Sequence, residues 1–272
     1  MNEQVFEKLG FTLEYTADGS PTLRLKETSK VMKNPHDILP ISGESMHHSA
    51  GAFSETAYIY GPLLDWCFKE FSQPHVLSVG LGLGYNEIYT AAIAQLNGNS
   101  RWSLDSFEIV EGLKNQFLES LHSSQEFQNS VYGSISNRLS EYLGLPQGSV
   151  YQQLNSAVLE NRLKVYGDIR GFSFTQKYHA ILQDAFSRKT NPDLWEENFL
   201  VELLSTTHPK SALASYASLG PLKRSLKHMG FESLNRDGYH GKRNCTLAAK
   251  GERPEHILKT LSEELKIKWK IS

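Results

Sequence analysis

Residues 76–88, VLSVGLGLGYNEI, constrain the fold more than any other stretch of the chain. A short apolar run ends at Gly80, and glycine then recurs at every second position as far as Gly84. Residues 85–96 follow with the apolar spacing of a helix, so the stretch predicts a strand that turns directly into a helix. Glycines at such a turn let the backbone approach a ligand, and the helix start offers free N–H groups. The stretch therefore predicts a cofactor-binding loop or, as the alternative, a tight turn that binds nothing.

Strands and helices alternate along the rest of the chain. We predict strands at 75–80, 103–109, 162–166, 178–184 and 211–216, and helices at 85–96, 193–206 and 219–229. This alternation is typical of a parallel sheet with helices on both faces. Near the end of the chain, the runs FESLN and NCTLAA are separated only by RDGYHGKR, which is too short for a crossover helix. These two strands must therefore pair antiparallel.

The domain organisation that we predict has three parts. Residues 1–50 form an N-terminal extension, with a β-hairpin where two alternating runs flank Asp18-Gly19. Residues 51–252 form the main α/β domain, with a helical insertion at about 112–160, and residues 253–272 form a C-terminal helix or tail. Residues 55–71 have helical spacing, but Gly61-Pro62 is expected to break or kink that helix.

Composition narrows the class of protein. A chain of 272 residues is long enough to bury a sizeable core. Its formal charge of -2 provides no general basic field, so any nucleic acid must be bound by a local basic patch. The two cysteines, Cys67 and Cys245, lie far apart and suggest free thiols in a reducing compartment. No apolar run reaches the roughly 18 residues of a membrane span, and the first residues, MNEQVFEKLG, lack a secretory pattern. These features predict a cytoplasmic protein.

Two acidic residues follow neighbouring strands at the edge where the glycines lie. Glu108 comes 24 residues after Gly84, close to the offset of about 20 residues at which an acid binds a ribose. Asp168 follows the next strand and could accept a hydrogen bond from an adenine amino group. The alternatives are a solvated acid at a helix start for Glu108 and a helix N-cap for Asp168. Together with the glycines, these residues favour a cofactor that contains adenosine.

Missing motifs narrow the chemistry further. The chain has no GxxxxGK[ST] loop, no GxSxG and no HExxH, which argues against phosphoryl transfer, serine hydrolysis and zinc peptidase activity. Without a phosphate-binding lysine loop, the glycine loop is better suited to an amino-acid moiety than to a pyrophosphate. This favours S-adenosyl-L-methionine, and no metal site is predicted.

The most distinctive stretch is YHAILQDAFSRKTNPDLWEENFL at 178–200. It resembles the DGFAPxKNPxMW pattern of the tRNA 5-methylaminomethyl-2-thiouridine methyltransferases, the methyltransferase half of MnmC-type enzymes. The residues kept without a gap are Asp184, Phe186, Asn191, Pro192 and Trp195.

Other segments resemble the same family in the same order over roughly 14–250. MHHSAGAFSETAYIY matches at His47, Gly51, Ala52 and Glu55; VGLGLGYN matches at Gly80, Gly82, Gly84 and Asn86; YGDI matches at Asp168; and SYASLGPLKRSLKHMGF and GYHGKRN match two segments near the end. The chain departs from the family pattern at Ser78, Ala185, Arg188 and Asn244.

The resemblance implies a class I S-adenosylmethionine-dependent methyltransferase fold, which is Rossmann-like, with a mostly parallel seven-stranded sheet and an antiparallel last strand. It also implies methyl transfer to the aminomethyl nitrogen of a modified wobble uridine in tRNA, with Asp184 as the catalytic carboxylate beside the amine. The implied cofactor-binding residues are Gly80, Gly82, Gly84, Asn86, Glu108 and Asp168. The implied substrate-binding residues are His47, Glu55, Phe186, Trp195, Lys242 and Arg243.

The chemistry suits Asp184, because an alkyl ammonium must lose a proton before its nitrogen can attack a methyl group, and a carboxylate can accept that proton. The alternatives are a loop-capping role for Asp184 and core packing for Trp195. The chain has no room for a flavin-dependent oxidase half, so a separate flavin-dependent oxidoreductase would act upstream. Two other functions stay open: a methyltransferase acting on a small-molecule or protein amine, and a non-catalytic binding protein of the same fold.

Overall fold

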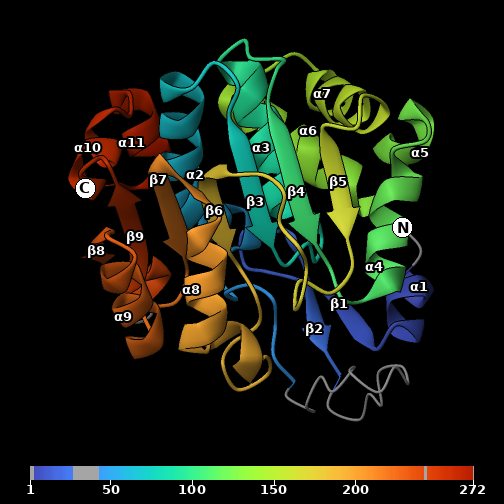
Figure 1. The fold of residues 1–272 in the computed structure, drawn as a ribbon. Helices are drawn as coiled ribbons and strands as arrows, with labels where there is room; N and C mark the ends of the chain where they lie inside the picture. Colours follow the sequence, from blue (N-terminus) through green and yellow to red (C-terminus); the bar gives the residue numbers. More distant parts are fainter. Residues whose placement is uncertain (1–2, 27–42, 242–243, 272) are drawn as a thin grey trace.

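The computed structural model describes residues 3–26, 43–241 and 244–271. Its centre is a seven-stranded sheet with the order β5-β4-β3-β6-β7-β9-β8 (Figure 1). The strands are β3 (His75–Val79), β4 (Ser103–Phe107), β5 (Leu163–Tyr166), β6 (Tyr178–Gln183), β7 (Thr207–Ser215), β8 (Glu232–Arg236) and β9 (Cys245–Lys250). The first five pair in parallel, and β9 runs antiparallel to both β7 and β8. The predicted sheet and its antiparallel last strand are confirmed.

Strand β7 differs from the prediction at its start. It begins at Thr207 rather than at residue 211, because Thr207 already pairs with Tyr178 of β6. The register then shifts before the regular pairing that begins with Ala180 and Ala212. Pro209 lies in this irregular stretch, where a missing N–H is tolerated because the ladder is already interrupted.

Helices cover both faces of the sheet (Figure 1). The helices are α1 (Glu3–Lys8), α2 (Ala52–Glu70), α3 (Tyr85–Leu96), α4 (Glu111–Ser120), α5 (Ser124–Gln128), α6 (Val131–Leu143), α7 (Ser149–Leu159), α8 (Glu197–Ser205), α9 (Gly220–His228), α10 (Pro254–Lys259) and α11 (Glu263–Trp269), with short 3-10 helices η1 (Pro192–Trp195) and η2 (Tyr239–Gly241). Alternate strand residues enter two separate cores: Val76 and Leu182 pack with α2 and α3, whereas Leu77 and Ile181 pack with α8 and α9. Burial on both faces explains why these strands are almost continuously apolar.

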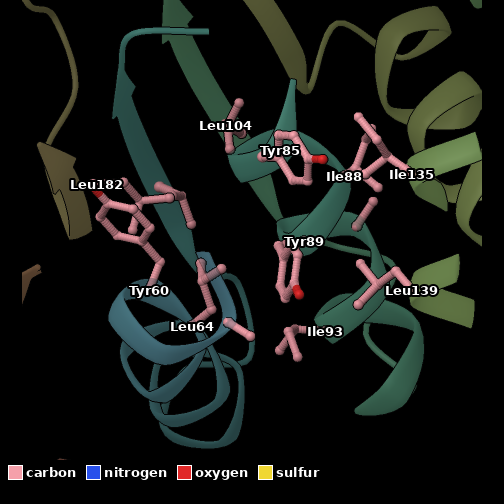
Figure 2. Packing of buried hydrophobic residues seen from close by; sticks show 14 of the residues in the cluster. Tyr60, Leu64, Tyr85, Ile88, Tyr89, Ile93, Leu104, Ile135, Leu139 and Leu182 are labelled. Carbon is pink, nitrogen blue, oxygen red and sulfur yellow. The ribbon is translucent and has the colours of Figure 1, made fainter. Parts of the chain in front are cut away.

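Helix α3 is buried along nearly its whole length because it lies between α2, α6 and the sheet (Figure 2). Two of its tyrosines keep their hydroxyl groups hydrogen-bonded inside this core. Tyr85 donates to the carbonyl oxygen of Pro21 at 2.8 Å, and Tyr89 donates to that of Phe53 at 3.0 Å. These two bonds join the helix that follows the glycine loop to the N-terminal part of the chain.

The helical insertion predicted at about 112–160 is present as four helices, α4 to α7, between β4 and β5. Its polar sequence supplies their boundaries: the hydroxyl of Ser130 accepts the N–H of Gly133 at the start of α6, and Gly144, with φ of 69°, ends that helix.

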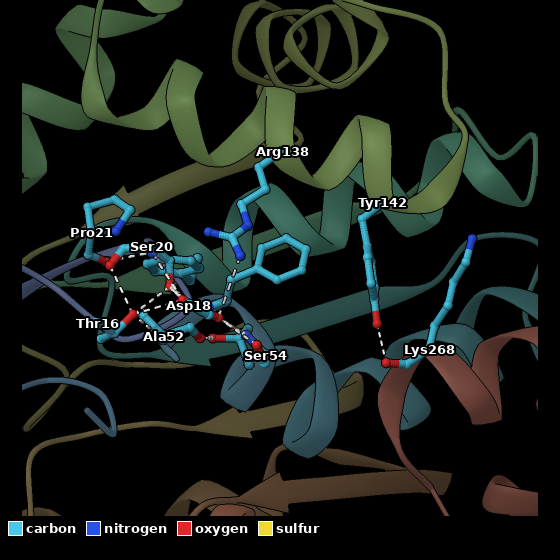
Figure 3. Close-up of polar contacts among 12 residues, drawn as sticks. Thr16, Asp18, Ser20, Pro21, Ala52, Ser54, Arg138, Tyr142 and Lys268 are labelled. Carbon is cyan, nitrogen blue, oxygen red and sulfur yellow. Dashed lines mark hydrogen bonds and ion pairs between the residues drawn. The ribbon is translucent and has the colours of Figure 1, made fainter. Parts of the chain in front are cut away.

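The predicted hairpin is confirmed: β1 (Phe11–Tyr15) pairs antiparallel with β2 (Pro21–Leu25), and the two strands lie beyond the carboxyl edge of the central sheet (Figure 1). Its turn bonds the first N–H groups of α2, because the N-cap residue Gly51 has no side chain to accept them (Figure 3). The acceptors are Thr16 Oγ1, Ser20 Oγ and Asp18 Oδ2, at 3.3, 3.0 and 3.4 Å from the nitrogen atoms of Ala52, Phe53 and Ser54. Gly51 allows this approach, because a Cβ there would lie 2.3 Å from Asp18 Oδ2.

The sequence predicts a break or a kink at Gly61-Pro62, and the break is absent. Helix α2 continues through Pro62, which lacks the N–H that would bond the carbonyl oxygen of Tyr58 one turn earlier. Arg236 supplies a substitute donor: its Nη2 lies 3.1 Å from that oxygen, and its guanidinium lies 4.4 Å from the centre of the Tyr58 ring. Gly61 in turn lets the indole of Trp269 pack against the helix. A donor from β8 therefore bonds the carbonyl oxygen that Pro62 leaves without a helical partner.

No helix within residues 3–26, 43–241 and 244–271 combines the length and apolar character needed to cross a membrane.

Replacing Asp18 tests whether the hairpin stabilises α2. Asp18→Ala removes the acceptor for Ser54 and for the turn, and we expect it to lower the free energy of unfolding by about 1–2 kcal/mol in chemical denaturation. Burial raises the pKa of Asp18, but hydrogen bonds from Ser20, Ser54 and Thr16 outweigh it, so the net pKa is lowered below its ordinary value of 3.8. The loss of stability in Asp18→Ala should therefore be fully present above about pH 3.8 and shrink as the pH falls below that value. The exposed Glu119→Ala on α4 is the control, and an equal loss in both variants would contradict the capping role.

Candidate active site

A cavity of about 930 Å³ opens at the carboxyl ends of β3, β4 and β6. Ligands of open parallel sheets bind at this edge, at the point where the strand order reverses. Here the order reverses at β3: β4 and β5 follow on one side of it, and β6 and β7 on the other. The predicted site residues that line it are Gly80, Gly82, Asn86, Glu108, Asp168, Asp184, His47, Glu55 and Phe186. The structure thus brings together residues that are up to 139 positions apart, from 47 to 186.

The three predicted glycines have different roles in the structure. Gly80 has φ of 99°, and a Cβ there would lie 2.7 Å from the carbonyl oxygen of Asp184, so the two strand ends can meet only with glycine. Gly82, with φ of 52°, lines the cavity; its nearest neighbour is Met46 Sδ, 2.9 Å from the position of a Cβ. Gly84 faces away, and a Cβ there would contact the ring of Phe117 at 2.8 Å. Gly84 therefore turns the chain into α3 and does not reach the cavity.

Glu108 lies almost fully buried at the end of β4. Its two carboxylate oxygens accept the backbone N–H groups of Val110 at 2.8 Å and Gly82 at 3.0 Å. Burial raises the pKa of Glu108, and these two hydrogen bonds partly oppose that rise. Each oxygen keeps a lone pair beyond its backbone bond, so the carboxylate is held rigidly with capacity to accept hydroxyl groups.

Asp168 follows β5 and lines the cavity near its rim. Its carboxylate forms a close ion pair with Arg170 at 2.7 Å, and Arg170 also reaches Asp193 at 3.0 Å. The loop after β5 is therefore tied to the start of η1. Arg170, which the sequence did not single out, keeps Asp168 at the rim.

Asp184, at the end of β6, is the most constrained acid of the cavity. Its Oδ1 accepts the hydroxyl of Tyr60 at 2.6 Å, and its Oδ2 accepts the amide N–H of Asn86 at 2.9 Å. Burial raises the pKa of Asp184 to about 7; the bonds from Tyr60 and Asn86 lower it, and the charges of Glu55 and Glu87 raise it. A carboxyl group that titrates near neutral pH in a cavity is typical of a general base.

Asn86 was predicted to bind the cofactor, and in the structure its side chain also bonds Asp184. Its Nδ2 is used by Asp184, whereas its buried Oδ1 has no hydrogen-bond partner within the described residues. An unsatisfied buried oxygen of this kind is costly unless a ligand donates to it. The residue thus connects Asp184 with the place where a donor of the cofactor can bind.

Two carboxylates that sequence reasoning missed support the site. Glu87 on α3 is fully buried; burial raises its pKa to about 7, and one of its oxygens accepts the hydroxyl of Ser106 at 2.8 Å. Glu44 accepts the backbone N–H of Ser187 at 3.0 Å and the hydroxyls of Ser187 and Thr190, so it holds the loop after Asp184. An acid in the first turn after the glycines was the available signal for Glu87, whereas nothing in the sequence pairs Glu44 with a loop 143 residues away.

The remaining predicted substrate residues divide into three groups. Glu55 and His47 line the cavity: the backbone N–H of His48 donates to Glu55, and His47 Nδ1 lies 3.0 Å from Thr22 Oγ1. Phe186 also lines it, whereas Trp195 is fully buried behind the wall and donates its indole N–H to the Phe186 carbonyl at 2.7 Å. Trp195 is therefore a packing residue that fixes Phe186. Lys242 and Arg243 lie outside the described residues.

These residues fit the predicted cofactor. Glu108 offers a rigid carboxylate for ribose hydroxyls, Asp168 lies at the rim beyond it, and the unsatisfied Asn86 oxygen suits an ammonium donor beside Asp184. S-adenosyl-L-methionine would supply an electrophilic methyl group at this place. Within the described residues, no group of three or more His, Cys, Asp or Glu side chains is arranged to hold a metal ion.

Comparisons with known proteins agree with this site. Residues 131–251 match the model of a family described as S-adenosyl-L-methionine-dependent methyltransferase. The chain is 29% identical over 243 residues to an uncharacterised protein of Methanocaldococcus jannaschii, covering 86% of this chain and 58% of that protein. It is 26% identical over 222 residues to the tRNA 5-methylaminomethyl-2-thiouridine biosynthesis bifunctional protein MnmC of Ralstonia nicotianae, covering 79% of this chain and 33% of that protein. The chain thus spans less than two thirds of each of these relatives.

A solved structure, that of MNMC2 from Aquifex aeolicus, has the same fold: the TM-score is 0.59 at 24% identity, over 96% of this chain and 83% of that one. The predicted fold class is confirmed, as is the resemblance to the methyltransferase part of MnmC-type proteins. The match also confirms S-adenosyl-L-methionine as the cofactor.

Removing the Glu108 carboxylate tests where the cofactor binds. We expect Glu108→Ala to weaken S-adenosyl-L-methionine binding by about 1–3 kcal/mol. The ribose hydroxyl groups of the cofactor lose an acceptor, and the backbone N–H of Gly82 loses its partner. Isothermal titration calorimetry measures this. Glu111→Ala, an exposed acid at the same edge of the cavity, is the control. Equal affinity in both variants would rule out Glu108 as a cofactor ligand.

Proposed function

We propose that this S-adenosyl-L-methionine-dependent methyltransferase methylates the nitrogen of an aminomethyl group on a modified wobble uridine in tRNA. The observation that carries the proposal is the acidic end of the cavity. Asp184 and Glu55 both line it, close enough for the charge of Glu55 to raise the pKa of Asp184. Two neighbouring carboxylates attract an alkyl ammonium and are unsuited to an anionic or enolate acceptor.

Asp184 is the residue to which we assign the chemistry. Tyr60 and Asn86 hold its carboxylate from two sides, so an ammonium that binds to it is oriented as well as attracted. The carboxylate accepts one proton from the ammonium, and the freed nitrogen lone pair can then form the new bond to carbon. The remaining contribution is the alignment of nitrogen with the methyl carbon and the sulfur atom that leaves.

The walls around this acid suit a planar base. Phe186 lines the cavity and is fixed from behind by Trp195. Tyr216 also lines it, and its hydroxyl donates to the carbonyl of Ala185 at 2.9 Å. Unstacked bases of single-stranded RNA are commonly held against aromatic side chains. The exposed Arg188 and Lys189, in the loop that Glu44 holds, could contact phosphate groups nearby.

The relatives support the choice of tRNA as acceptor. The MnmC proteins of Ralstonia nicotianae and Campylobacter hominis are named for the biosynthesis of 5-methylaminomethyl-2-thiouridine in tRNA. The chain covers 33% and 28% of those bifunctional proteins. We further propose that a flavin-dependent oxidoreductase activity acts upstream and supplies the aminomethyl uridine. The reaction would take place in the cytoplasm, where tRNA is modified.

The test is to incubate the protein with labelled S-adenosyl-L-methionine and bulk tRNA that carries the aminomethyl uridine without its N-methyl group. The nucleosides are then analysed by mass. We expect the label in a methylaminomethyl uridine. Label in a small-molecule or protein amine, with none in tRNA, would overturn the tRNA acceptor and retain the amine methyltransferase. The absence of transfer to any amine would favour a binding protein.

Asp184→Asn separates the proposed base from a structural acid. We expect turnover to fall by roughly 10²–10⁴, with cofactor affinity within a few-fold of the wild type. The wild-type rate should rise with pH through about 7, where Asp184 loses its proton, and the variant should lack this step but recover partly at higher pH, where more amine is neutral. Asp193→Asn, an exposed acid of the same cavity, is the control. Wild-type turnover in Asp184→Asn would remove this residue from the mechanism.

The same substitution should stabilise the protein at high pH. The pKa of Asp184 in the folded protein, about 7, lies above its ordinary value of 3.8. This group therefore lowers the stability of the fold as the pH rises from about 4 to about 7, and its full cost is present above pH 7. We expect Asp184→Asn to raise the free energy of unfolding at pH 8 by about 1–3 kcal/mol, and the gain to disappear as the pH falls toward 4. Urea unfolding at both pH values measures this. A less stable variant at pH 8 would mean that the charged carboxylate stabilises the fold.

A further inference from the structure

A second pocket, of about 450 Å³, lies beside α2 between α6, η2 and the end of α11. We refer to it as the basic pocket, after the side chains that line it together with aromatic rings: Phe53, Arg138, Tyr142, Tyr239, Lys268 and Lys270. Helix α2 separates it from the main cavity, because Glu55 and Tyr60 line the main cavity whereas Phe53 and Ser54 line the basic pocket.

Cations lie over aromatic faces in this pocket. The guanidinium of Arg138 lies 5.0 Å from the centre of the Phe53 ring, and Lys268 Nζ lies 5.7 Å from that of Tyr142. The carbonyl of Lys268 also accepts the hydroxyl of Tyr142, which joins α11 to α6 (Figure 3). Cation–π contacts position a charged group without using its N–H donors. The rings beside them therefore orient these two cations at the pocket.

Arg138 forms an ion pair with Asp18, whose Oδ2 lies 3.8 Å from Arg138 Nη2, beyond hydrogen-bonding distance (Figure 3). The Asp18 carboxylate already accepts hydrogen bonds from Thr16, Ser20 and Ser54. The guanidinium N–H groups of Arg138 therefore donate no hydrogen bond to Asp18. An arginine held over a ring is suited to bind a phosphate or carboxylate.

Cations outnumber carboxylates among the side chains that line the pocket. Arg138, Lys268 and Lys270 line it against one carboxylate, Glu141. Two further carboxylates, Asp18 and Glu264, pair from outside the lining with Arg138 at 3.8 Å and with Lys268 at 2.7 Å. Lys270 ends α11 with a left-handed backbone, φ of 53°. The preceding residue, Trp269, packs its ring on Gly61, so the end of α11 is anchored to α2.

Aromatic residues connect the basic pocket with the main cavity. Tyr239 lines the pocket, and its ring centre lies 5.8 Å from that of His48. The backbone N–H of His48 donates to Glu55, which lines the main cavity. A chain that carries one unit in the main cavity could therefore place its next unit against Tyr239 and the basic pocket.

We propose that the basic pocket binds the phosphate and base of a nucleotide adjacent to the acceptor nucleotide in an RNA strand. Cations that hold phosphate beside rings that stack with bases are the common means of binding single-stranded RNA. The inference rests on the proposed function, because it takes RNA to be the substrate. It explains how a chain with a net charge of -2 can bind a polyanion: the contact is local.

The test uses Arg138→Gln and Lys270→Asn in the full chain. Glutamine keeps methylene groups over Phe53, and asparagine tolerates the left-handed backbone at residue 270, so both variants should fold; thermal melting and S-adenosyl-L-methionine affinity verify this. Affinity for a fluorescently labelled anticodon stem–loop RNA is measured by anisotropy at several KCl concentrations. We expect each variant to bind about two- to fivefold more weakly and to lower the salt slope by about one.

Arg101→Gln is the matched control, because Arg101 is exposed at the opposite, amino-terminal edge of the sheet and lines neither cavity. If both pocket variants keep the affinity and salt slope of Arg101→Gln while the wild type methylates tRNA, the basic pocket is excluded and the proposed function stands. If the wild type neither binds the RNA nor methylates tRNA, the proposed function fails and the inference fails with it.

Discussion

The carboxyl group of Asp184 is the point on which the arrangement of this protein depends. It accepts hydrogen bonds from Tyr60 on α2 and Asn86 on α3, and the backbone N–H of Asp184 bonds the carbonyl of Val79 at 3.0 Å. One residue thus joins two helices to the two central strands. Gly80 is required beside it, since any Cβ would meet its carbonyl oxygen. Because the group is both desolvated and immobile, its affinity for a proton is set by the fold.

Helix α2 divides the two cavities, and contacts from distant parts of the chain satisfy backbone groups at its start and near Pro62. The hairpin turn bonds its first N–H groups, and Arg236 replaces the donor that Pro62 lacks. One side of the helix presents Glu55 and Tyr60 to the main cavity, and the other lies beneath the basic pocket. The position of the acidic acceptor end therefore depends on residues that touch neither cofactor nor substrate.

Some motif positions serve packing rather than ligand binding. Gly84 makes room for Phe117, and Trp195 supports Phe186 from behind, although both belong to segments that resemble an active site. Spacing alone cannot separate these roles, because residues two positions apart in a tight turn can face opposite sides. In contrast, Gly80, Gly82 and Glu108 were found at the cavity, since the carboxyl ends of adjacent parallel strands meet at one edge.

The sequence by itself determined the sheet, the order of strands and helices, the hairpin, and the edge at which Glu108 and Asp184 meet. These features follow from local periodicity and from short connections, which are properties of neighbouring residues. Only the tertiary structure decided that Tyr60 binds Asp184 across 124 residues and that Glu44 holds the acceptor loop across 143. It also decided that α2 passes through Pro62 and that the carboxyl of Asp184 titrates near neutral pH. Such contacts depend on which side chains the packed elements bring together, and no pattern along the chain records that.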